Sequence, residues 1–175
     1  MKYFKIIFIV SIKIIIALVL IFPHQPYLKI ENTDSSKVYY YRFPKGSTFS
    51  IRYLHSYDRT PVLEVFKADK CLNIIPVEVK YYSDTYDLRF ARYSKADTEV
   101  TNEYVRIYNI IPQRYDRLKE VFINIKNFEP QYLSINPYLK DYSFINFGEK
   151  GDLLRISIVK NNFIQIFLRG VFIND

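Results

Sequence analysis

The chain has 175 residues and a formal net charge of +7, with 25 Lys and Arg against 18 Asp and Glu. This length fits one folded domain plus a short additional segment. A single Cys excludes an internal disulfide, and two His are too few for a zinc or iron cluster, so we expect no metal and no cofactor.

The basic residues are spread along the chain and do not form a block. Lys2, Lys5 and Lys13 lie in an N-terminal segment without acidic residues, and the other basic residues are interspersed with acidic ones. Scattered charge is typical of a solvated surface, whereas a nucleic-acid site needs a basic stripe along the phosphates. We therefore expect no nucleic-acid partner. The 17 Tyr and 14 Phe favour β structure, because these rings suit pleated, half-buried surfaces.

An apolar segment, Ile6–Phe22, follows the first lysines and is interrupted only by Ser11 and Lys13. It is at the short limit for a membrane-spanning helix, which needs about 20 residues. If Lys13 is counted with the basic end, Ile14–Phe22 has the length of a signal-peptide core. No small residues follow Phe22 to form a cleavage site, so we favour an uncleaved signal anchor over a cleaved signal or a buried N-terminal helix.

Both membrane interpretations place the basic N-terminus in the cytoplasm and export the rest of the chain to the periplasm or the cell surface. Pro23 and Pro26 end the apolar segment and open an extended linker. The sequence thus predicts two parts. Residues 1–26 form a membrane anchor and linker, with Ile6–Phe22 in the membrane, and residues 27–175 form an extracytoplasmic β domain.

The elements predicted after the linker are strands. Tyr27–Glu31 and Val38–Phe43 flank a cluster of turn residues and predict a hairpin, which the Pro-Lys-Gly-Ser turn at 44–47 follows. Further along, Cys71–Tyr82 is a strand region in which Pro76 indicates a bulge or a sheet edge. We expect Cys71 to be a small buried side chain.

Between these regions, the stretch Phe49–Phe66 sets polar residues between two apolar runs, as two strands and a turn. Its candidate site residues are Arg52, His55, Ser56, Asp58, Thr60 and Glu64. Alternation places His55 on the apolar face of the first strand and Arg52 on the opposite face, and it places Glu64 among apolar neighbours in the second. A hairpin would bring Glu64 within reach of His55 or Arg52, depending on the register.

The second half of the chain continues with short strands. Ser83–Thr101 is a polar excursion, Tyr104–Ile111 returns to strand character, and a helical turn is expected between Pro112 and Glu120. The remaining predicted strands are Val121–Phe128, Gln131–Ile135, Tyr142–Phe147, and a C-terminal hairpin of Leu153–Val159 and Phe163–Ile173. The pattern predicts an all-β fold, either a small antiparallel sandwich or a partly open barrel.

Catalysis is disfavoured in the Phe49–Phe66 stretch. His55, Ser56 and Asp58 are the residue types of a nucleophilic triad, but neighbours on a strand point to opposite faces and no nucleophile elbow is present. Asp58 and Glu64 are a carboxylate pair of the kind glycosidases use, although any protein offers such a pair by chance. We therefore expect a protein that is not an enzyme.

Two interpretations of the stretch stay open. In the first, His55, Thr60 and Glu64 form a hydrogen-bonded network that fixes the register of the hairpin. In the second, Arg52, His55 and the turn meet a small anionic ligand or an acidic partner surface.

The segments Phe49–Ser56 and Thr60–Val62, with Glu64, the single apolar N-terminal segment and the many strands, resemble the family catalogued as domain of unknown function 1850. The resemblance implies a small exported or membrane-anchored protein, often encoded beside organic-acid transporters of the tripartite periplasmic type. It therefore implies an accessory or sensing role, with transporter subunits as partners. A structural envelope or assembly protein without a ligand is the alternative.

Overall fold

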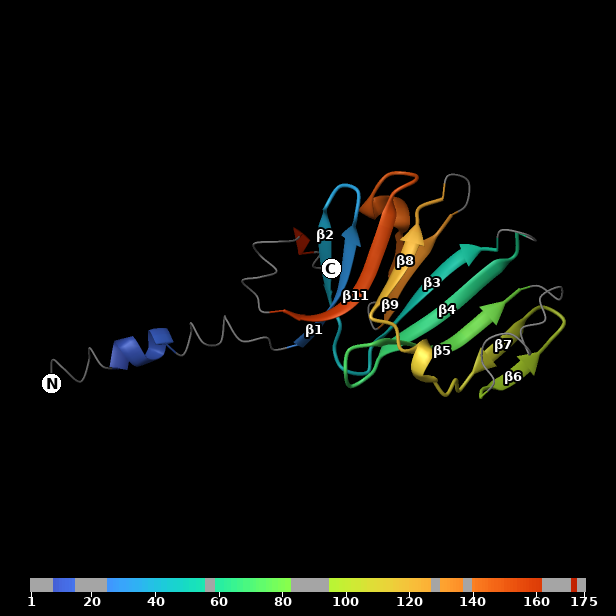
Figure 1. The fold of residues 1–175 in the computed structure, drawn as a ribbon, viewed down its shortest axis with the longest axis horizontal. Coiled ribbons are helices and arrows are strands. Elements are labelled where there is room, and N and C mark those ends of the chain that lie inside the picture. Colours follow the sequence, from blue (N-terminus) through green and yellow to red (C-terminus); the bar gives the residue numbers. More distant parts are fainter. Residues whose placement is uncertain are drawn as a thin grey trace.

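The computed structural model describes residues 8–14, 25–55, 59–82, 95–126, 130–136, 140–161 and 171–172. Most of these residues lie in two β-sheets (Figure 1). The smaller sheet has the order β12-β2-β1-β11-β8 and contains β1 (Gln25–Asn32), β2 (Val38–Arg42), β8 (Glu120–Asn124), β11 (Leu153–Asn161) and β12 (Val171–Phe172).

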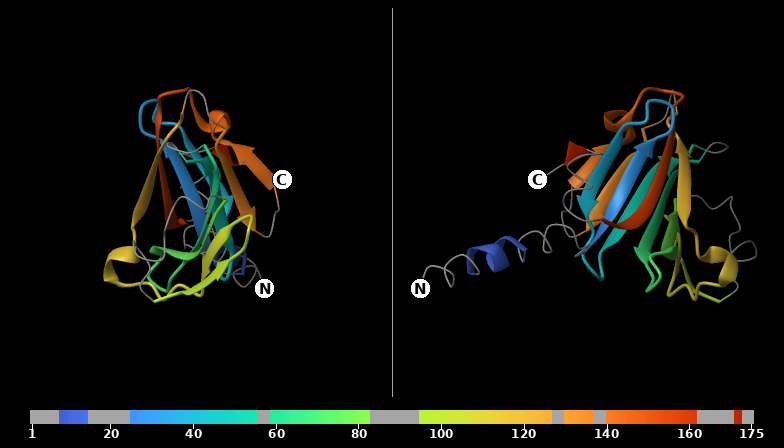
Figure 2. Two further views of the ribbon diagram at one scale, coloured as in Figure 1. Left: turned by 90° about the vertical axis from the view of Figure 1, so that its right-hand side faces the viewer. Right: turned by 60° about the vertical axis from the view of Figure 1, so that its left-hand side comes forward.

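The larger sheet has the order β10-β9-β3-β4-β5-β7-β6. Its strands are β3 (Thr48–Leu54), β4 (Pro61–Ala68), β5 (Ile74–Tyr81), β6 (Asp97–Val100), β7 (Val105–Tyr108), β9 (Tyr132–Asn136) and β10 (Lys140–Ser143). Two short 3-10 helices, η2 (Arg114–Asp116) and η3 (Phe144–Phe147), connect strands. In the views of Figures 1 and 2, β7 and β6 lie at the end of the larger sheet that is farthest from β2.

The main core lies between the two sheets, so the predicted all-β sandwich is confirmed. Alternate residues of each strand supply it, as the period of a strand requires. The smaller sheet contributes Leu28, Ile30, Tyr41, Leu154 and Ile156, and the larger sheet contributes Phe49, Ile51, Phe66, Leu133 and Ile135. A separate small cluster of Val79, Ile107 and Ile110 lies under β5 and β7.

The two hairpins predicted in the first half of the chain are confirmed. β1 pairs with β2 in antiparallel fashion, and β3 pairs with β4 so that Phe49 lies opposite Phe66 and Ile51 opposite Glu64. The register between β4 and β5 shifts beside Pro76, which confirms the predicted bulge. η2 confirms the expected helical turn between β7 and β8.

Other expectations about the second half were wrong in part. The polar excursion contains β6, a strand that its alternation of polar residues concealed, and residues 83–94 of it lie outside the described ranges. The stretch Tyr142–Phe147 is strand only to Ser143, because Phe144 and Phe147 turn into the core from η3.

The predicted C-terminal hairpin would pair Leu153–Val159 with Phe163–Ile173. The described residues of the second segment, Val171 and Phe172, do not pair with the first. β12 pairs in parallel with β2, where Val171 lies opposite Tyr39, and β11 instead lies between β1 and β8. Residues 162–170, which include most of the predicted second strand, lie outside the described ranges. The physical reason is that β1 pairs along one edge of β11 and β8 pairs along the other between Leu153 and Ser157, so these edges are not free for a hairpin partner.

The turn between β4 and β5 overturns the expectation for Cys71, which is exposed. Asp69 organises this turn: its carboxylate accepts hydrogen bonds from the backbone N–H groups of Cys71 (2.8 Å) and Asn73 (2.9 Å) and from the Asn73 side chain (2.8 Å). It also forms an ion pair with Arg117 at 2.8 Å. Cys71 is exposed because these bonds hold the turn outside the sheet.

These contacts predict an acid-sensitive contribution to stability. Burial raises the pKa of Asp69, but the hydrogen bonds from Asn73 and Cys71 and the Arg117 guanidinium outweigh burial and hold this pKa below its ordinary value of 3.8. A lowered pKa in the folded state stabilises the fold above the unfolded-state pKa, and the contribution is lost as the pH falls through the folded-state pKa. Urea titrations at pH 7 and near pH 3 should therefore show a smaller acid-induced loss in Asp69→Asn than in the native chain. A loss of equal size in both proteins would contradict the prediction, and Glu103→Gln, an exposed acidic residue, is the control.

Residues 8–14 form a short helix that carries exposed apolar side chains, among them Phe8 at 59 % and Ile14 at 54 % exposure. Within the described ranges, no helix has both the length and the apolar character needed to cross a membrane. The rest of the predicted anchor, apart from this helix, lies outside the described residues.

Candidate functional site

The predicted site residues of the β3–β4 hairpin lie on two faces of the larger sheet. Arg52 is on the outer face, where its Nη2 atom lies 2.9 Å from Asp141 Oδ2 and its guanidinium lies 4.8 Å from the ring centre of Tyr132. Ser134 donates a hydrogen bond to the same carboxylate. Arg52 is thus held by β9 and β10 and not by the second strand of its own hairpin.

Glu64 and its contacts lie on the inner face. The Tyr53 hydroxyl donates a hydrogen bond to Glu64 Oε1 at 3.4 Å, so these two side chains are brought together. At the end of the hairpin, the backbone N–H of His55 donates to the Thr60 carbonyl at 2.8 Å, and the Nδ1 atom of His55 is buried. Because Arg52 and Glu64 lie on opposite faces, the structure does not bring them together.

The turn of this hairpin is described only in part. Ser56 and Asp58, two of the predicted site residues, lie outside the described residues. Arg59 has a left-handed backbone, with φ of 61°, and its N–H donates to the His55 carbonyl at 3.0 Å. Two backbone hydrogen bonds, from His55 to Thr60 and from Arg59 to His55, therefore close this end of the hairpin.

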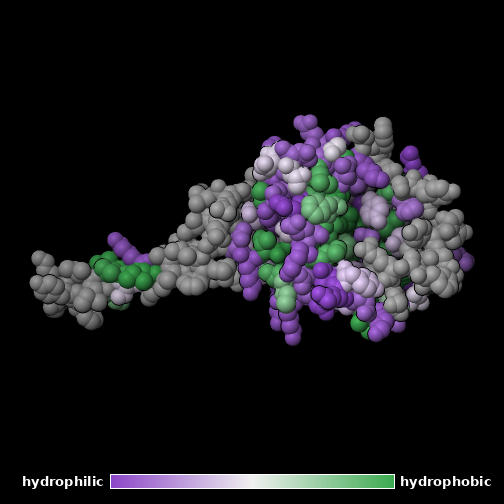
Figure 3. All heavy atoms as spheres, in the orientation of Figure 1, coloured by the Kyte–Doolittle hydropathy of each residue, from purple (hydrophilic) through white to green (hydrophobic). Residues whose placement is uncertain are grey.

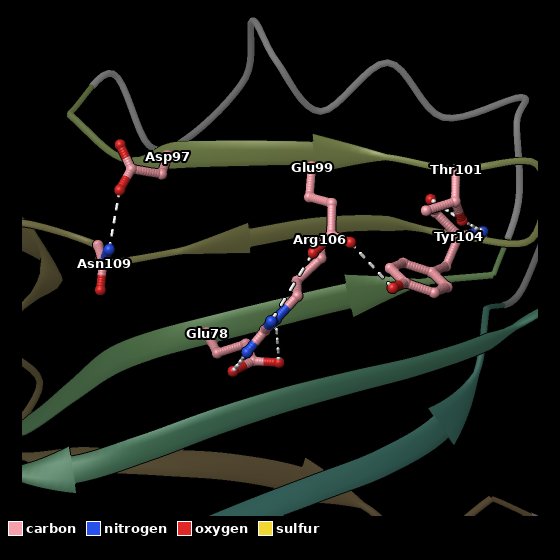
Figure 4. Close-up of polar contacts among 7 residues, drawn as sticks. All are labelled: Glu78, Asp97, Glu99, Thr101, Tyr104, Arg106 and Asn109. Atoms are coloured by element: carbon pink, nitrogen blue, oxygen red, sulfur yellow. Dashed lines mark hydrogen bonds and ion pairs between the residues drawn. The ribbon is translucent and has the colours of Figure 1, made fainter.

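A second polar cluster, which the sequence interpretation missed, covers the outer face of β5, β7 and β6 (Figure 4). Its centre is a two-pronged ion pair: Arg106 Nε and Nη2 each donate to a different oxygen of Glu78 at 2.8 Å. The hydrogen bonds to Glu78 raise the pKa of Arg106 above its already high ordinary value. Glu99 on β6 lies 3.7 Å from Arg106 Nη1 and accepts a hydrogen bond from the Tyr104 hydroxyl at 3.1 Å.

Tyrosine rings flank the cations of this cluster. The Lys80 ammonium lies 3.6 Å from the ring centre of Tyr104 and 4.9 Å from that of Tyr82, so two rings contact one cation. The Arg106 guanidinium lies 4.9 Å from the ring centre of Tyr108. We call this surface the cation–tyrosine face and define it by Glu78, Lys80, Tyr82, Glu99, Tyr104, Arg106 and Tyr108.

The ends of β6 and β7 are also fixed by side chains. Asn109 donates to Asp97 Oδ2 at 2.8 Å, and the Thr101 hydroxyl accepts from the backbone N–H of Tyr104 at 3.0 Å (Figure 4). The same hydroxyl accepts from the backbone N–H of Glu103 at 3.2 Å in the tight turn between the strands. These bonds fix the ends of β6 and β7 beside the rings and cations of the cation–tyrosine face.

The sequence contained a signal for this face. Glu78 and Lys80 on β5, and Tyr82 just after it, alternate with apolar residues. Tyr104, just before β7, and Arg106 on β7 do the same. In each of these two strands, alternation predicts that the charged and aromatic side chains share one solvent-exposed face. Opposite charges on the two strands favour their pairing side by side in a sheet. The sequence does not predict that β5 and β7 are neighbouring strands, because the polar excursion separates them along the chain.

The described side chains of the β3–β4 hairpin and of the cation–tyrosine face form ion pairs, hydrogen bonds and contacts between cations and aromatic rings. Among the described residues, no group of three or more His, Cys, Asp and Glu side chains could hold a metal ion. A search of protein families, of curated proteins and of solved structures finds no match for this chain in any of the three.

Proposed function

We propose that the chain is a membrane-tethered accessory protein, without enzymatic activity, that meets a protein partner through the cation–tyrosine face. The observation that carries the proposal is the clustering of Tyr82, Tyr104 and Tyr108 around Lys80 and Arg106 on one outward face. Tyr and Arg are enriched in protein interfaces and provide most of the binding energy at their centres. The resemblance gives the partner class, namely subunits of a tripartite organic-acid transporter.

The tether is supported by the apolar run Ile6–Phe22 and by the exposure of the apolar side chains on the helix at residues 8–14. Such side chains are stabilised when a bilayer covers them. Export of the β domain follows from the position of Lys2 and Lys5 before this run.

Removal of two rings tests the partner surface. Tyr82→Ala with Tyr104→Ala removes both rings that contact Lys80 but keeps the Glu78–Arg106 ion pair. We expect recovery of transporter subunits from detergent-solubilised membranes to fall by roughly tenfold or more. The measurement is affinity purification of the full chain followed by identification and quantification of the bound proteins. A thermal melt of each variant checks that the fold is retained.

The control is Phe122→Ala, which removes an aromatic side chain that is 55 % exposed on the outer face of the smaller sheet. It should leave recovery unchanged. Equal recovery by the native chain and the double variant would refute the cation–tyrosine face as the partner surface. Purification of envelope components in place of transporter subunits would support the structural alternative.

A further inference from the structure

The end of the sandwich at which the chain enters β1 gathers basic side chains that are scattered in the sequence. β1 begins and β2 ends here, since the Phe43 N–H donates to the Pro26 carbonyl at 3.0 Å. β3 begins and β4 ends here too, with Thr48 opposite Lys67. We call this end, with the turns that leave it, the basic end; its cations are Arg42, Lys45, Lys67, Lys70, Arg114, Arg117, Lys119 and Lys160.

The neighbouring helix η2 belongs to the same end, because Leu118 forms a bridge with Ile74 and Arg117 pairs with Asp69. Side chains of hydrophilic residues project from the lower side of the domain in Figure 3, where this end lies. The eight cations come from four separate parts of the sequence. Only the pairing of the strands brings them together.

The described acidic residues of the basic end, Asp69, Asp116 and Glu120, are fewer than its eight cations and offset only part of its positive charge. Asp69 is bound by Arg117 and by backbone N–H groups, and Asp116 is buried and accepts from the Gln113 N–H at 2.8 Å. Glu120 faces Arg155 at 3.7 Å. In the part of the chain that the structure describes, no ion pair joins Lys45, Lys67 or Lys70 to an acidic residue.

Among the described residues, the opposite end has no such surplus. Its turns carry the acidic residues Asp34, Glu103, Glu149 and Asp152 beside the basic residues Lys37, Arg59, Lys126 and Lys150. The two ends of the domain therefore differ in charge, and the positive one is the end at which the chain arrives from the apolar segment.

The distance from the apolar segment to the basic end is short. The segment ends at Phe22 and β1 begins at Gln25. Three extended residues span at most about 10 Å. This length is close to the Debye length of about 8 Å at physiological ionic strength, so the start of β1 in a tethered domain lies within electrostatic reach of the bilayer surface.

Apolar and amphipathic side chains accompany the cations. Tyr115 on η2 is 67 % exposed, and Ile111, just before η2, is 61 % exposed. An exposed Tyr beside Lys and Arg is the combination found where proteins meet the membrane–water interface.

We infer that the basic end docks on anionic phospholipid headgroups and so fixes the orientation of the β domain on the membrane. This inference rests on the proposed tether and specifies its second contact. Clustered juxtamembrane Lys and Arg are attracted to anionic lipids, and the attraction weakens with salt. Docking of this end leaves the cation–tyrosine face, on the side of the larger sheet, open to a protein partner.

Cys71 provides a reporter for the experiment. It is the single Cys of the chain, is exposed, and lies in the same turn as Lys70. The full chain, labelled at Cys71 with an environment-sensitive fluorophore, is reconstituted into vesicles of phosphatidylcholine alone or mixed with phosphatidylglycerol. Each preparation contains a headgroup-located quencher lipid.

We expect quenching of the Cys71 label to be roughly threefold or more stronger in the anionic vesicles, and to fall to the phosphatidylcholine value in high salt. Reversal of three cations, Lys45→Glu, Lys67→Glu and Lys70→Glu, should abolish the difference. The matched control reverses Lys37, Lys126 and Lys150 to Glu at the opposite end, with the same change in net charge, and should retain it.

Equal quenching in the two kinds of vesicle, or equal quenching by the two triple variants, would overturn the inference while leaving the tether intact. Flotation of the unlabelled chain separates the two failures. A chain that floats with neither kind of vesicle would refute the tether, and the docking of the basic end with it.

Discussion

Replacement of Asn32 by Ala should reduce the free energy of unfolding by about 3 kcal/mol, among the largest effects of any single polar substitution in the β domain. Asn32 is fully buried at the end of β1. Its Nδ2 atom donates to the Phe147 carbonyl at 3.2 Å and to Asp152 Oδ2 at 2.6 Å. Its Oδ1 atom accepts from the backbone N–H groups of Asp34 (3.0 Å) and Ser35 (2.9 Å).

The effect is large because one side chain joins three parts of the fold: the β1–β2 turn, η3 and the turn before β11. Loss of the side chain leaves buried polar atoms without their partner, and this costs more than a hydrogen bond contributes when it forms. Urea unfolding followed by circular dichroism measures the change, and for a chain of this length the midpoint of thermal unfolding should fall by roughly 10 °C.

Asn124→Ala is the matched control, because the Asn124 amide also donates to a turn carbonyl, that of Gly151 at 3.2 Å, but is exposed. Its removal should cost about 0.5 kcal/mol or less. Equal destabilisation by the two substitutions would show that the buried network around Asn32 does not act as described. Asn32→Ala should leave partner binding through the cation–tyrosine face unchanged in conditions where the variant is folded.

The hairpins were predictable from the sequence because their signals are local. Alternation over Phe49–His55 placed Arg52 outward, and the turn residues between Glu31 and Val38 set the first hairpin. The same reasoning could not find the partners of β1 and β11, which join residues more than a hundred positions apart, such as Ile30 and Ile156. Pairing at that distance depends on the packing of whole sheets and leaves no local mark.

The candidate sites divide in the same way. Polar residues close in sequence predict a candidate site in the β3–β4 hairpin. Glu78 and Arg106, by contrast, form their ion pair across 28 positions, and β6 lies in a stretch without apolar alternation. Cys71 was misplaced because its residue type favours burial, while its position in the Asp69 turn imposes exposure. The basic end could not be predicted either, because its lysines and arginines are scattered in the sequence and the strand order alone brings them together.

Gly148→Ala should be at least as damaging as Asn32→Ala, with a loss of about 3 kcal/mol or more, and for a steric reason. Gly148 has an extended backbone, with φ of 176°, so the new residue adopts its conformation without strain. Its Cβ, however, would overlap Asn32 Nδ2 and lie 2.7 Å from Asp152 Oδ2. Gly46→Ala is the contrasting control: no atom lies within 4 Å of the new Cβ, and only the φ of 90° opposes it, which costs roughly 1 kcal/mol.

A double-mutant cycle distinguishes this clash from a general weakness of the η3–β11 turn. In the Asn32→Ala background the overlapping amide is gone, so Gly148→Ala should cost less there than in the native chain, by about 1 to 3 kcal/mol. Unfolding free energies of the native chain, both single variants and the double variant give this coupling directly. An additive result would mean that the Asn32 amide moves aside for the new methyl group, and that Gly148 is not the residue that lets β1 and the turn before β11 close on each other.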